Sequence, residues 1–319
     1  MITFQNVSKK YDDTTVVDQL NFTIKEQEIF VLVGPSGSGK TTTLKMINHL
    51  ITLTEGDILI EGQSFKEYDL YELRWNIGYV LQQIALFPNM TVEENISIVP
   101  EMLNWDKSKI TDRITELLEM VRLEPDTYRH REVSELSGGQ QQRIGVARAL
   151  AANPDILLMD EPFSALDPIS RFGLQEDLIS LQNQLNKTIV FVTHDMQEAI
   201  KVGDRICIMN EGKVEQIGTP EDILQNPEND FVKEFIKTGL PEYQEKQSIK
   251  DLINSGTLTP IHANLDHTLT LDDSVNKLLE ELIMNDRAII KDDEHIYEVT
   301  QVDYLKYLKD SKNEGNDEA

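Results

Sequence analysis

The sequence has little cysteine, no long hydrophobic run and comparatively little positive charge, and each scarcity excludes a class of proteins. Cys207 is the single cysteine among 319 residues, so no disulfide can form within the chain, and this composition fits a reducing compartment. No apolar run approaches the roughly 18 residues of a membrane span, and residues 1–11 lack the charged-then-apolar pattern of a signal peptide. We therefore expect a cytoplasmic chain that would serve any membrane process through partners.

Basic residues are scarce relative to acidic ones. The chain carries 30 Lys and Arg against 56 Asp and Glu, which gives a formal net charge of −26. No basic block or arm interrupts this excess, and a surface that binds a polyanion needs one. We therefore expect no nucleic-acid partner and no direct contact with anionic lipid headgroups.

Residues 1–238 alternate short apolar runs with amphipathic helical patterns, which predicts an α/β domain with a largely parallel sheet. Several of the runs are nearly continuous Ile, Leu and Val, as expected for strands covered on both faces. The strands are predicted at 28–34, 76–82, 155–161, 188–194 and 204–210. Cys207 lies in the last of them, and we interpret it as a small buried residue rather than a reactive thiol.

The character of the chain changes near Gly239. Residues 239–247 are polar and contain helix breakers, which predicts a linker. Residues 248–308 then contain an apolar helical stripe and a strand–turn–strand pattern, typical of a small α+β unit. The polar residues 309–319 predict a disordered tail.

A phosphate-binding pattern, G-x-x-x-x-G-K-T, lies between a predicted strand and a predicted helix at 30–43. Its glycines let the backbone turn tightly, so that successive amides and the helix N-terminus face phosphate oxygens. Lys40 supplies a point charge for the β and γ phosphates, and the Thr41 hydroxyl suits Mg²⁺. An ordinary glycine turn is the alternative, and the flanking strand and helix disfavour it. The candidate nucleotide-binding residues here are Gly34, Pro35, Ser36, Gly37, Ser38, Gly39, Lys40, Thr41 and Thr42.

Three further predicted strands end in side chains that can bind a metal or take part in catalysis. Asp160 and Glu161 end one, His194 ends another and Gln82 a third, and α/β proteins bind ligands at the carboxyl ends of parallel strands. Two acids after a strand are most often a solvated loop, but a neighbouring P-loop favours a catalytic role. Asp160 suits a water-mediated contact to Mg²⁺, and Glu161 suits a general base for the attacking water, worth about 10²–10⁴ in rate. His194 is a candidate γ-phosphate sensor, and the Gln82 amide suits contact with the metal or the attacking water.

The stretch SELSGGQQQR at 134–143 combines a helix cap with two glycines. Ser137 and Gln140 fit a capping box, worth about 1 kcal/mol. A cap does not explain Gly138 and Gly139, which weaken a helix but let a phosphate approach the backbone closely. Because the chain already has one P-loop, a symmetric head-to-tail pair is the economical solution, with Ser137 and Gly139 facing the phosphate held by a second copy.

In order and spacing these motifs resemble the ATP-binding subunits of ABC transporters. The likeness covers about residues 1–238, and its motifs are the P-loop, the Q-loop at Gln82, LSGGQ at 136–140, ILLMDE at 156–161, SALD at 164–167 and His194. It implies ATP hydrolysis with ATP and Mg²⁺ as cofactors, Tyr11 as the aromatic that stacks on adenine, and Asp167 at the dimer interface. It also implies a helical subdomain at about 84–150, whose groove receives a cytoplasmic helix of a membrane partner.

Finer likeness points to one group of importers. Residues 94–105, 160–171 and 187–224 resemble the ATPases of quaternary-amine, or osmoprotectant, importers. This implies uptake of glycine betaine, carnitine or choline through two transmembrane permease subunits and an external binding protein, with this chain peripheral on the cytoplasmic face of the membrane. An importer of polyamines or amino acids, or a regulatory ABC ATPase without a permease, is the alternative. About a hundred residues separate the P-loop from LSGGQ, too few for the long coiled coil of chromosome-maintenance ATPases.

Residues 248–308 resemble a single CBS unit, a strand–helix–strand–strand–helix module. Thr300 and Asp303 match the T-x-x-D that holds a ribose in nucleotide-binding members, whereas Tyr297 stands where a glycine is usual. So short a unit would be marginal alone, so we expect it to pair with its copy in a second subunit. A nucleotide or ionic-strength sensor and a structural dimerisation element are the two interpretations.

Overall fold

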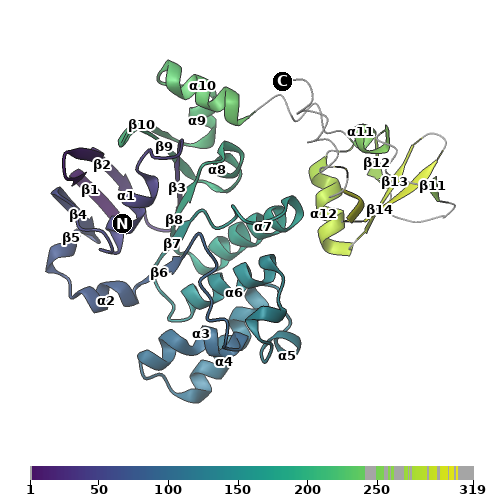
Figure 1. Ribbon diagram of the computed structural model, residues 1–319, viewed down its shortest axis with the longest axis horizontal. Coiled ribbons are helices and arrows are strands. Elements are labelled where there is room, and N and C mark those ends of the chain that lie inside the picture. Colours follow the sequence, from purple (N-terminus) through teal and green to yellow (C-terminus); the bar gives the residue numbers. More distant parts are fainter. Residues whose placement is uncertain are drawn as a thin grey trace. The chain divides into compact units, whose positions relative to one another are not determined.

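The computed structural model divides the chain into two compact units (Figure 1). The first comprises Met1–Leu166 and Leu174–Gly239, and the second comprises Asp167–Gly173 and Leu240–Ala319. The structure describes residues 2–240, 249–254, 258, 260–261, 269–271, 273, 275–285, 287–292, 295–300, 302–304 and 307. The predicted linker beyond residue 240 and the predicted tail at 309–319 lie outside the described residues.

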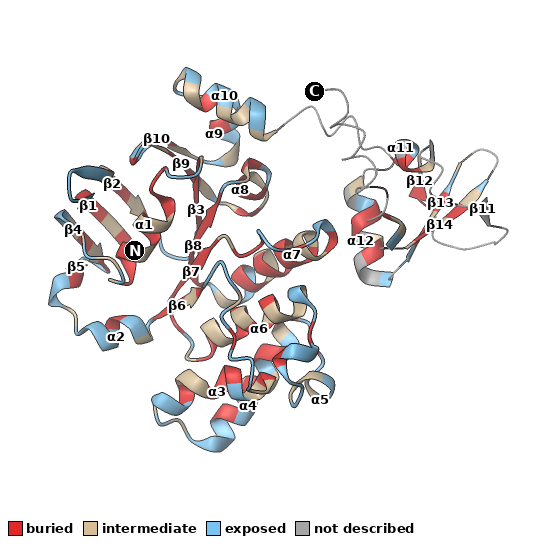
Figure 2. Cartoon of the chain, in the orientation of Figure 1, coloured by how far each residue is buried: buried red, intermediate tan, exposed pale blue. Residues whose placement is uncertain are grey.

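A six-stranded sheet of order β10-β9-β3-β8-β7-β6 forms the centre of the first unit. Its neighbouring strands are parallel, except that β10 runs antiparallel to β9. Every residue of β3, β7 and β8 is buried, which is why these strands are continuous aliphatic runs (Figure 2). The five strands predicted from such runs are confirmed. The strands are β3 (Ile29–Val33), β6 (Ile77–Val80), β7 (Ile156–Asp160), β8 (Thr188–Thr193), β9 (Arg205–Asn210) and β10 (Lys213–Gly218).

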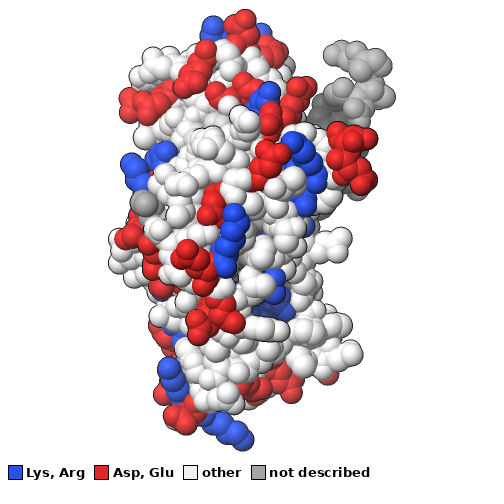
Figure 3. All heavy atoms as spheres, turned by 90° about the vertical axis from the view of Figure 1, so that its left-hand side faces the viewer, with Lys and Arg blue, Asp and Glu red and all other residues white. Residues whose placement is uncertain are grey.

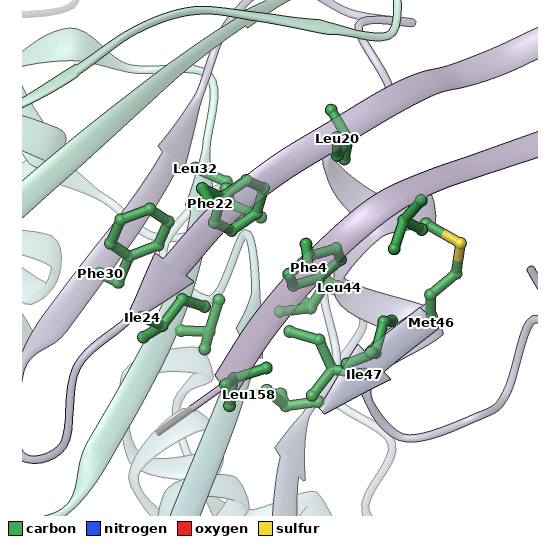
Figure 4. Packing of buried hydrophobic residues seen from close by; sticks show 14 of the residues in the cluster. Phe4, Leu20, Phe22, Ile24, Phe30, Leu32, Leu44, Met46, Ile47 and Leu158 are labelled. Atoms are coloured by element: carbon green, nitrogen blue, oxygen red, sulfur yellow. The ribbon is translucent and has the colours of Figure 1, made fainter. Parts of the chain in front are cut away.

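A second, antiparallel sheet of order β2-β1-β4-β5 lies beside α1, a feature that the sequence analysis did not predict. Its strands alternate buried and exposed positions only irregularly, because β1 shifts register between Phe4 and Tyr11. The rings of Phe4 and Phe22 stack with centroids 4.4 Å apart, and Phe22 stacks on Phe30 of β3 at 5.5 Å. Figure 4 shows these rings in one cluster with Leu44 of α1. The strands are β1 (Ile2–Tyr11), β2 (Thr14–Ile24), β4 (Glu55–Ile60) and β5 (Gln63–Ser64).

Helices cover the sheets and fill the chain between β6 and β7. The helix α4 shows why: its buried residues Ile110, Ile114 and Leu117 share one face at helical spacing. Figure 1 shows α1 on the side of the antiparallel sheet and α7 and α8 on the other side of the six-stranded sheet. The helices of the first unit are α1 (Lys40–Ile47), α2 (Leu70–Trp75), α3 (Val92–Met102), α4 (Lys107–Met120), α5 (Pro125–Tyr128), α6 (Gly138–Leu150), α8 (Met196–Val202), α9 (Pro220–Gln225) and α10 (Asp230–Gly239). The helix α7 (Pro168–Leu185) belongs to the first unit from Leu174 onward, and its residues up to Gly173 belong to the second.

The second unit has its own four-stranded sheet of order β11-β14-β13-β12. The helix α12 buries Leu278, Leu279 and Leu282 in the core of this unit, as the apolar stripe predicted. The strand pair predicted after it is also present, because β13 pairs antiparallel with β14. The elements are α11 (Ile249–Asn254), β11 (Pro260–Ile261), β12 (Leu269–Thr270), α12 (Val275–Asn285), β13 (Arg287–Lys291) and β14 (Ile296–Thr300).

The exposed surface carries charges of both signs. On the face shown in Figure 3 acidic and basic side chains are interspersed, and ion pairs such as Lys10–Glu55, with nitrogen and oxygen 2.9 Å apart, lie on the antiparallel sheet. Exposed pairs of this kind contribute little to stability. Within the described residues no helix is both long and apolar enough to cross a bilayer.

Candidate functional site

The loop between β3 and α1 is shaped by glycines. Gly34, Gly37 and Gly39 have φ of 155°, 81° and 96°, conformations that residues with a Cβ rarely adopt. A Cβ built on Gly34 would lie 2.1 Å from the carbonyl oxygen of Met209 in β9. Glycine at 34 is therefore required both by conformation and by space, and the loop packs directly against the neighbouring strand.

Lys40 begins α1 and turns back over the loop. Its ammonium donates to the carbonyl oxygens of Gly34 at 2.7 Å and of Pro35 at 2.8 Å, and the residue is only 5 % exposed. Burial lowers the pKa of Lys40, and the carboxylates of Glu161 and Asp160 oppose that shift. A buried cation at the N-terminus of a helix is suited to attract phosphate oxygens.

Asp160, the last residue of β7, is held by three side chains from α1 and β6. Thr41 of α1 donates its hydroxyl to Oδ1 at 2.8 Å, and Tyr79 of β6 donates its hydroxyl to Oδ2 at 3.3 Å. The ammonium of Lys45 lies 3.9 Å from Oδ2. Burial and the adjacent Asp160 carboxylate raise the pKa of Tyr79, so its hydroxyl stays a donor.

The pairing of Thr41 with Asp160 tests whether a magnesium ion fits. A hydroxyl oxygen and a carboxylate oxygen 2.8 Å apart are ligands of the kind that Mg²⁺ prefers, and Mg²⁺ in nucleotide sites uses one or two carboxylates together with substrate phosphates. Within the described residues no cluster of three or more His, Cys, Asp or Glu forms a dedicated metal cage. The residues present therefore fit a metal that arrives with a nucleotide.

Glu161 is the point at which three of the predicted residues meet. Gln82 donates its amide to Oε2 at 3.2 Å, and Nδ1 of His194 lies 3.1 Å from the same oxygen. Glu161 has φ of 45°, a left-handed conformation that is costly for glutamate and recurs at functional sites. Its amide is anchored on the carbonyl of Val192 at 3.0 Å, so the turned backbone directs its side chain to Gln82 and His194.

The segment before α6 forms the helix cap that the sequence predicts. Ser137 Oγ accepts from the amide of Gln140 at 3.3 Å, and the Ser137 amide donates to Gln140 Oε1 at 2.9 Å. Gly138 is exposed, and a Cβ there would meet no atom within 4 Å. Neither packing within the chain nor a positive φ requires this glycine. Among the described residues no hydrogen bond or ion pair joins Ser137 to the P-loop of the same chain.

An ion-pair cluster, buried except for the half-exposed Arg122, joins α6 to α7. Asp177 of α7 lies between two guanidinium groups, with Arg143 Nη2 at 2.7 Å and Arg122 Nε at 2.9 Å. Burial raises the pKa of Asp177, and the two arginines oppose that rise. Removing one member of a buried ion pair is expected to cost about 3–5 kcal/mol. The cluster thus ties the helix that Ser137 caps to the helix that follows strand β7.

Two further predicted site residues, Tyr11 and Asp167, make no contact with Glu161 in the hydrogen bonds of the described residues. Tyr11 pairs with Thr14 at the end of β1 and is 46 % exposed. The carbonyl oxygen of Val16, two residues after Thr14, would lie 2.9 Å from a Cβ on Gly39. The hairpin formed by β1 and β2 therefore lies beside the P-loop. Asp167 caps α7, because its Oδ1 accepts from the amides of Ile169 and Ser170 at 3.1 and 3.0 Å.

Tyr79 and Lys45 are site residues that the sequence analysis missed. Lys45 carried a usable signal, since it lies one helical turn after Thr41 and therefore shares its face. Tyr79 carried none, because its approach to Asp160 depends on the register in which β6 pairs with β7.

An apolar groove of about 510 Å³ is lined in part by Tyr79. Tyr71 and Phe87 at its rim are 72 % and 50 % exposed. Arg148 of α6 forms part of the wall, and its Nη1 donates to the carbonyl of Ala85 at 2.7 Å. Residues that line it include Tyr71, Trp75, Tyr79, Phe87, Val99 and Arg148. It therefore lies between the strand β6 and the helices α2, α3 and α6.

In the second unit both T-x-x-D sequences act as local caps. Thr300 donates its hydroxyl to Asp303 at 2.6 Å and accepts the Asp303 amide at 3.3 Å. Thr270 and Asp273 form a similar pair, with the hydroxyl donating at 3.0 Å. Each Thr–Asp pair therefore has a structural role whether or not it meets a ligand.

Comparison with known proteins places this geometry in a family. Residues 17–164 match the family model described as ABC transporter. The chain is 51 % identical over 272 residues to the glycine betaine/carnitine/choline transport ATP-binding protein OpuCA of Bacillus subtilis (strain 168), a match that covers 85 % of this chain and 71 % of that protein. The chain belongs to the ABC transporter ATP-binding family.

Two further members of the family extend the comparison. The choline transport ATP-binding protein OpuBA of the same organism is 46 % identical over 297 residues, covering 91 % of this chain and 77 % of its own. A dimeric structure of a post-hydrolysis state of the ATP-binding cassette MJ0796, bound to ADP and Pi, is 36 % identical with a TM-score of 0.61. It covers 69 % of this chain and 99 % of that cassette. The predicted P-loop NTPase fold of ABC type is confirmed, and this ABC ATPase uses ATP.

The geometry at Gly34 predicts a large effect of a single methyl group. We expect Gly34→Ala to lower the free energy of unfolding by about 3 kcal/mol or more, because the new Cβ meets the Met209 carbonyl as well as straining the backbone. Gly62→Ala is the matched control, since Gly62 also has a positive φ but has nothing within 4 Å. It should cost only about 1–2 kcal/mol. Urea unfolding of the two variants checks this, and equal losses would contradict it.

Proposed function

We propose that this chain is the ATP-hydrolysing subunit of an importer for quaternary-amine osmoprotectants of the glycine betaine, carnitine and choline class. The observation that carries the hydrolytic role is the convergence of Gln82 and His194 on the Glu161 carboxylate, next to the buried Lys40. The cargo class is supported by the relatives named for glycine betaine, carnitine and choline transport.

Each side chain of the site would have a separate role in ATP hydrolysis. Lys40 and the amides of residues 34–42 hold the phosphates of ATP, and Tyr11 stacks on its adenine. Glu161 accepts a proton from the attacking water, while Gln82 and His194 hold its carboxylate and meet that water and the γ-phosphate. The left-handed backbone at Glu161 would keep this carboxylate directed at Gln82 and His194.

Thr41, Asp160 and Gln82 would hold Mg²⁺. Bound there with ATP, the ion would neutralise charge on the phosphate oxygens. The chain contributes the oriented donors: Thr41 lies against Asp160 Oδ1, and Tyr79 and Lys45 restrain Oδ2.

A second copy of the chain completes the site. Ser137, Gly138, Gly139 and Gln140 would face the γ-phosphate held by the partner copy, with Asp167 at the same interface. The exposure of Gly138 supports this, because a glycine that its own chain does not require is explained by close approach of something outside the chain. The dimeric state of the MJ0796 cassette is consistent with such pairing.

The apolar groove beside Tyr79 suits a cytoplasmic helix of a permease subunit. Its wall is mostly apolar, and exposed aromatic rings such as Tyr71 and Phe87 flank it, as expected for a surface that receives an amphipathic helix. Two permease subunits and an external binding protein would complete the importer, and this chain would then lie peripherally at the cytoplasmic face of the membrane.

The second unit would serve as a CBS-like dimerisation element. Its described order of strand, helix, strand and strand from β12 to β14 supports the likeness, and the Thr–Asp caps favour a structural role over a ribose site. We also propose residues 1–238, 239–247 and 248–308 as the ATPase domain, linker and CBS-like unit.

Glu161→Gln tests the catalytic assignment. We expect ATP turnover to fall about 100-fold or more, because the amide cannot accept the proton, while ATP binding persists and a dimer accumulates. Phosphate release and size-exclusion chromatography with ATP measure the two effects. Glu61→Gln is the control, since Glu61 is exposed and has a similar φ of 52°. Wild-type turnover in Glu161→Gln would refute the role.

Gly138→Ala separates folding from pairing. We expect the urea midpoint to stay the same or rise, because the methyl meets nothing within 4 Å and alanine favours helix. Turnover and ATP-dependent dimerisation should fall about tenfold or more, as a steric loss above 1.4 kcal/mol implies. Gly145→Ala, in the same helix and also unobstructed, should keep both. Normal dimerisation of Gly138→Ala would exclude close approach at this residue.

Uptake measurements test the cargo. In a strain that lacks this gene, accumulation of labelled glycine betaine, carnitine or choline should fall and return when the wild-type gene is restored, but not with the Glu161→Gln gene. Labelled spermidine and a neutral amino acid serve as comparison substrates. Loss of spermidine or amino-acid uptake with unchanged betaine, carnitine and choline uptake would overturn the cargo class.

A further inference from the structure

Tyr79 belongs to two sites at once. It is one of the residues that line the apolar groove, and its hydroxyl donates to Asp160 Oδ2 at 3.3 Å. The strand register explains how one side chain reaches both, because β6 pairs parallel with β7 and sets Tyr79 opposite Leu158, two residues before Asp160. A single residue, Tyr79, therefore takes part in both the groove and the contact to the carboxylate.

Two donors face Oδ2 of Asp160, and the Tyr79 hydroxyl is nearer to it than the Lys45 ammonium is. Thr41 occupies Oδ1, and at Oδ2 the other partner among the described residues is Lys45, whose ammonium is 3.9 Å away. Lys45 has a long side chain and is about one-third exposed, so its hold on the oxygen is loose. Without the Tyr79 hydroxyl, Thr41 and the loosely held Lys45 would be the remaining side chains among those described here that restrain Asp160.

We propose that Tyr79 is a positioning residue that couples the groove to the metal-holding carboxylate. The proposal rests on the function proposed above. A permease helix seated in the groove contacts the ring of Tyr79, and the hydroxyl transmits any shift of that ring to the rotamer of Asp160. Through this contact the permease can tune how firmly the site holds its metal, over a path of one side chain and one hydrogen bond.

Metal binding in the absence of turnover tests the hydroxyl. In the full-length Glu161→Gln chain with ATP, Mn²⁺ binding followed by electron paramagnetic resonance should weaken about 10-fold or more when Tyr79→Phe is added, as expected for loss of one hydrogen bond to a charged group. Binding of ATP without divalent metal should not change. Tyr68→Phe is the matched control, because the Tyr68 hydroxyl donates to the Ile60 carbonyl at 3.0 Å, away from the site.

A groove-filling substitution tests the coupling. Val99 lines the groove, and Val99→Trp should change the Mn²⁺ affinity of the Glu161→Gln chain at least about threefold, yet have no effect when Tyr79→Phe is also present. Val99→Phe serves if the tryptophan variant fails to fold. The same change of affinity with and without the hydroxyl would overturn the coupling.

Two further results distinguish failure of the Tyr79 proposal from failure of the proposed ATPase function. Unchanged Mn²⁺ affinity in Tyr79→Phe, with only a lower urea midpoint, would mean that the hydroxyl merely satisfies a buried group, and the proposal would fall. If the parent chain with Tyr79 intact binds no ATP, the proposed function itself fails, and that result is visible before any Tyr79 variant is made.

Discussion

Parallel pairing of β3, β8, β7 and β6 is the constraint on which the rest of the site depends. In a parallel sheet the carboxyl ends of all strands lie at one edge. The register aligns Val33 with Thr193 and Asp160 with Val192, so the residues that follow these strand ends emerge together. The P-loop, the two acids, His194 and Gln82 come from four distant parts of the sequence, and this pairing brings them to one edge.

The two adjacent acids then take different partners because the backbone turns between them. Asp160 ends β7 and points to Thr41, Tyr79 and Lys45. Glu161 enters the left-handed region and points to Gln82 and His194. A continued strand would place successive side chains on opposite faces of the sheet. The turn keeps both carboxylates at the edge and separates the metal-holding role that we propose for Asp160 from the proton-accepting role that we propose for Glu161.

The helix α6 connects the surface at Ser137, which we propose faces a nucleotide, to the groove. Ser137 caps its N-terminus, and Arg148 near its C-terminus forms part of the groove wall. Arg143, between them, is ion-paired with Asp177 of α7. The same helix therefore joins the Ser137 cap to the groove wall. Tyr79 offers a second and shorter connection, from the groove to Asp160.

Local patterns in the sequence were enough to determine the elements that carry the chemistry. Aliphatic runs identified β3, β6, β7, β8 and β9 because strands covered on both faces must be apolar throughout, and the P-loop and the Ser137–Gln140 cap follow from short-range rules. Only the tertiary structure decided what depends on register and on contacts between distant segments. These are the antiparallel sheet beside α1, the φ of Glu161, the Arg143–Asp177 pair and the approach of Tyr79 to Asp160. Such features arise from how strands align and helices pack, and a linear sequence does not display that alignment.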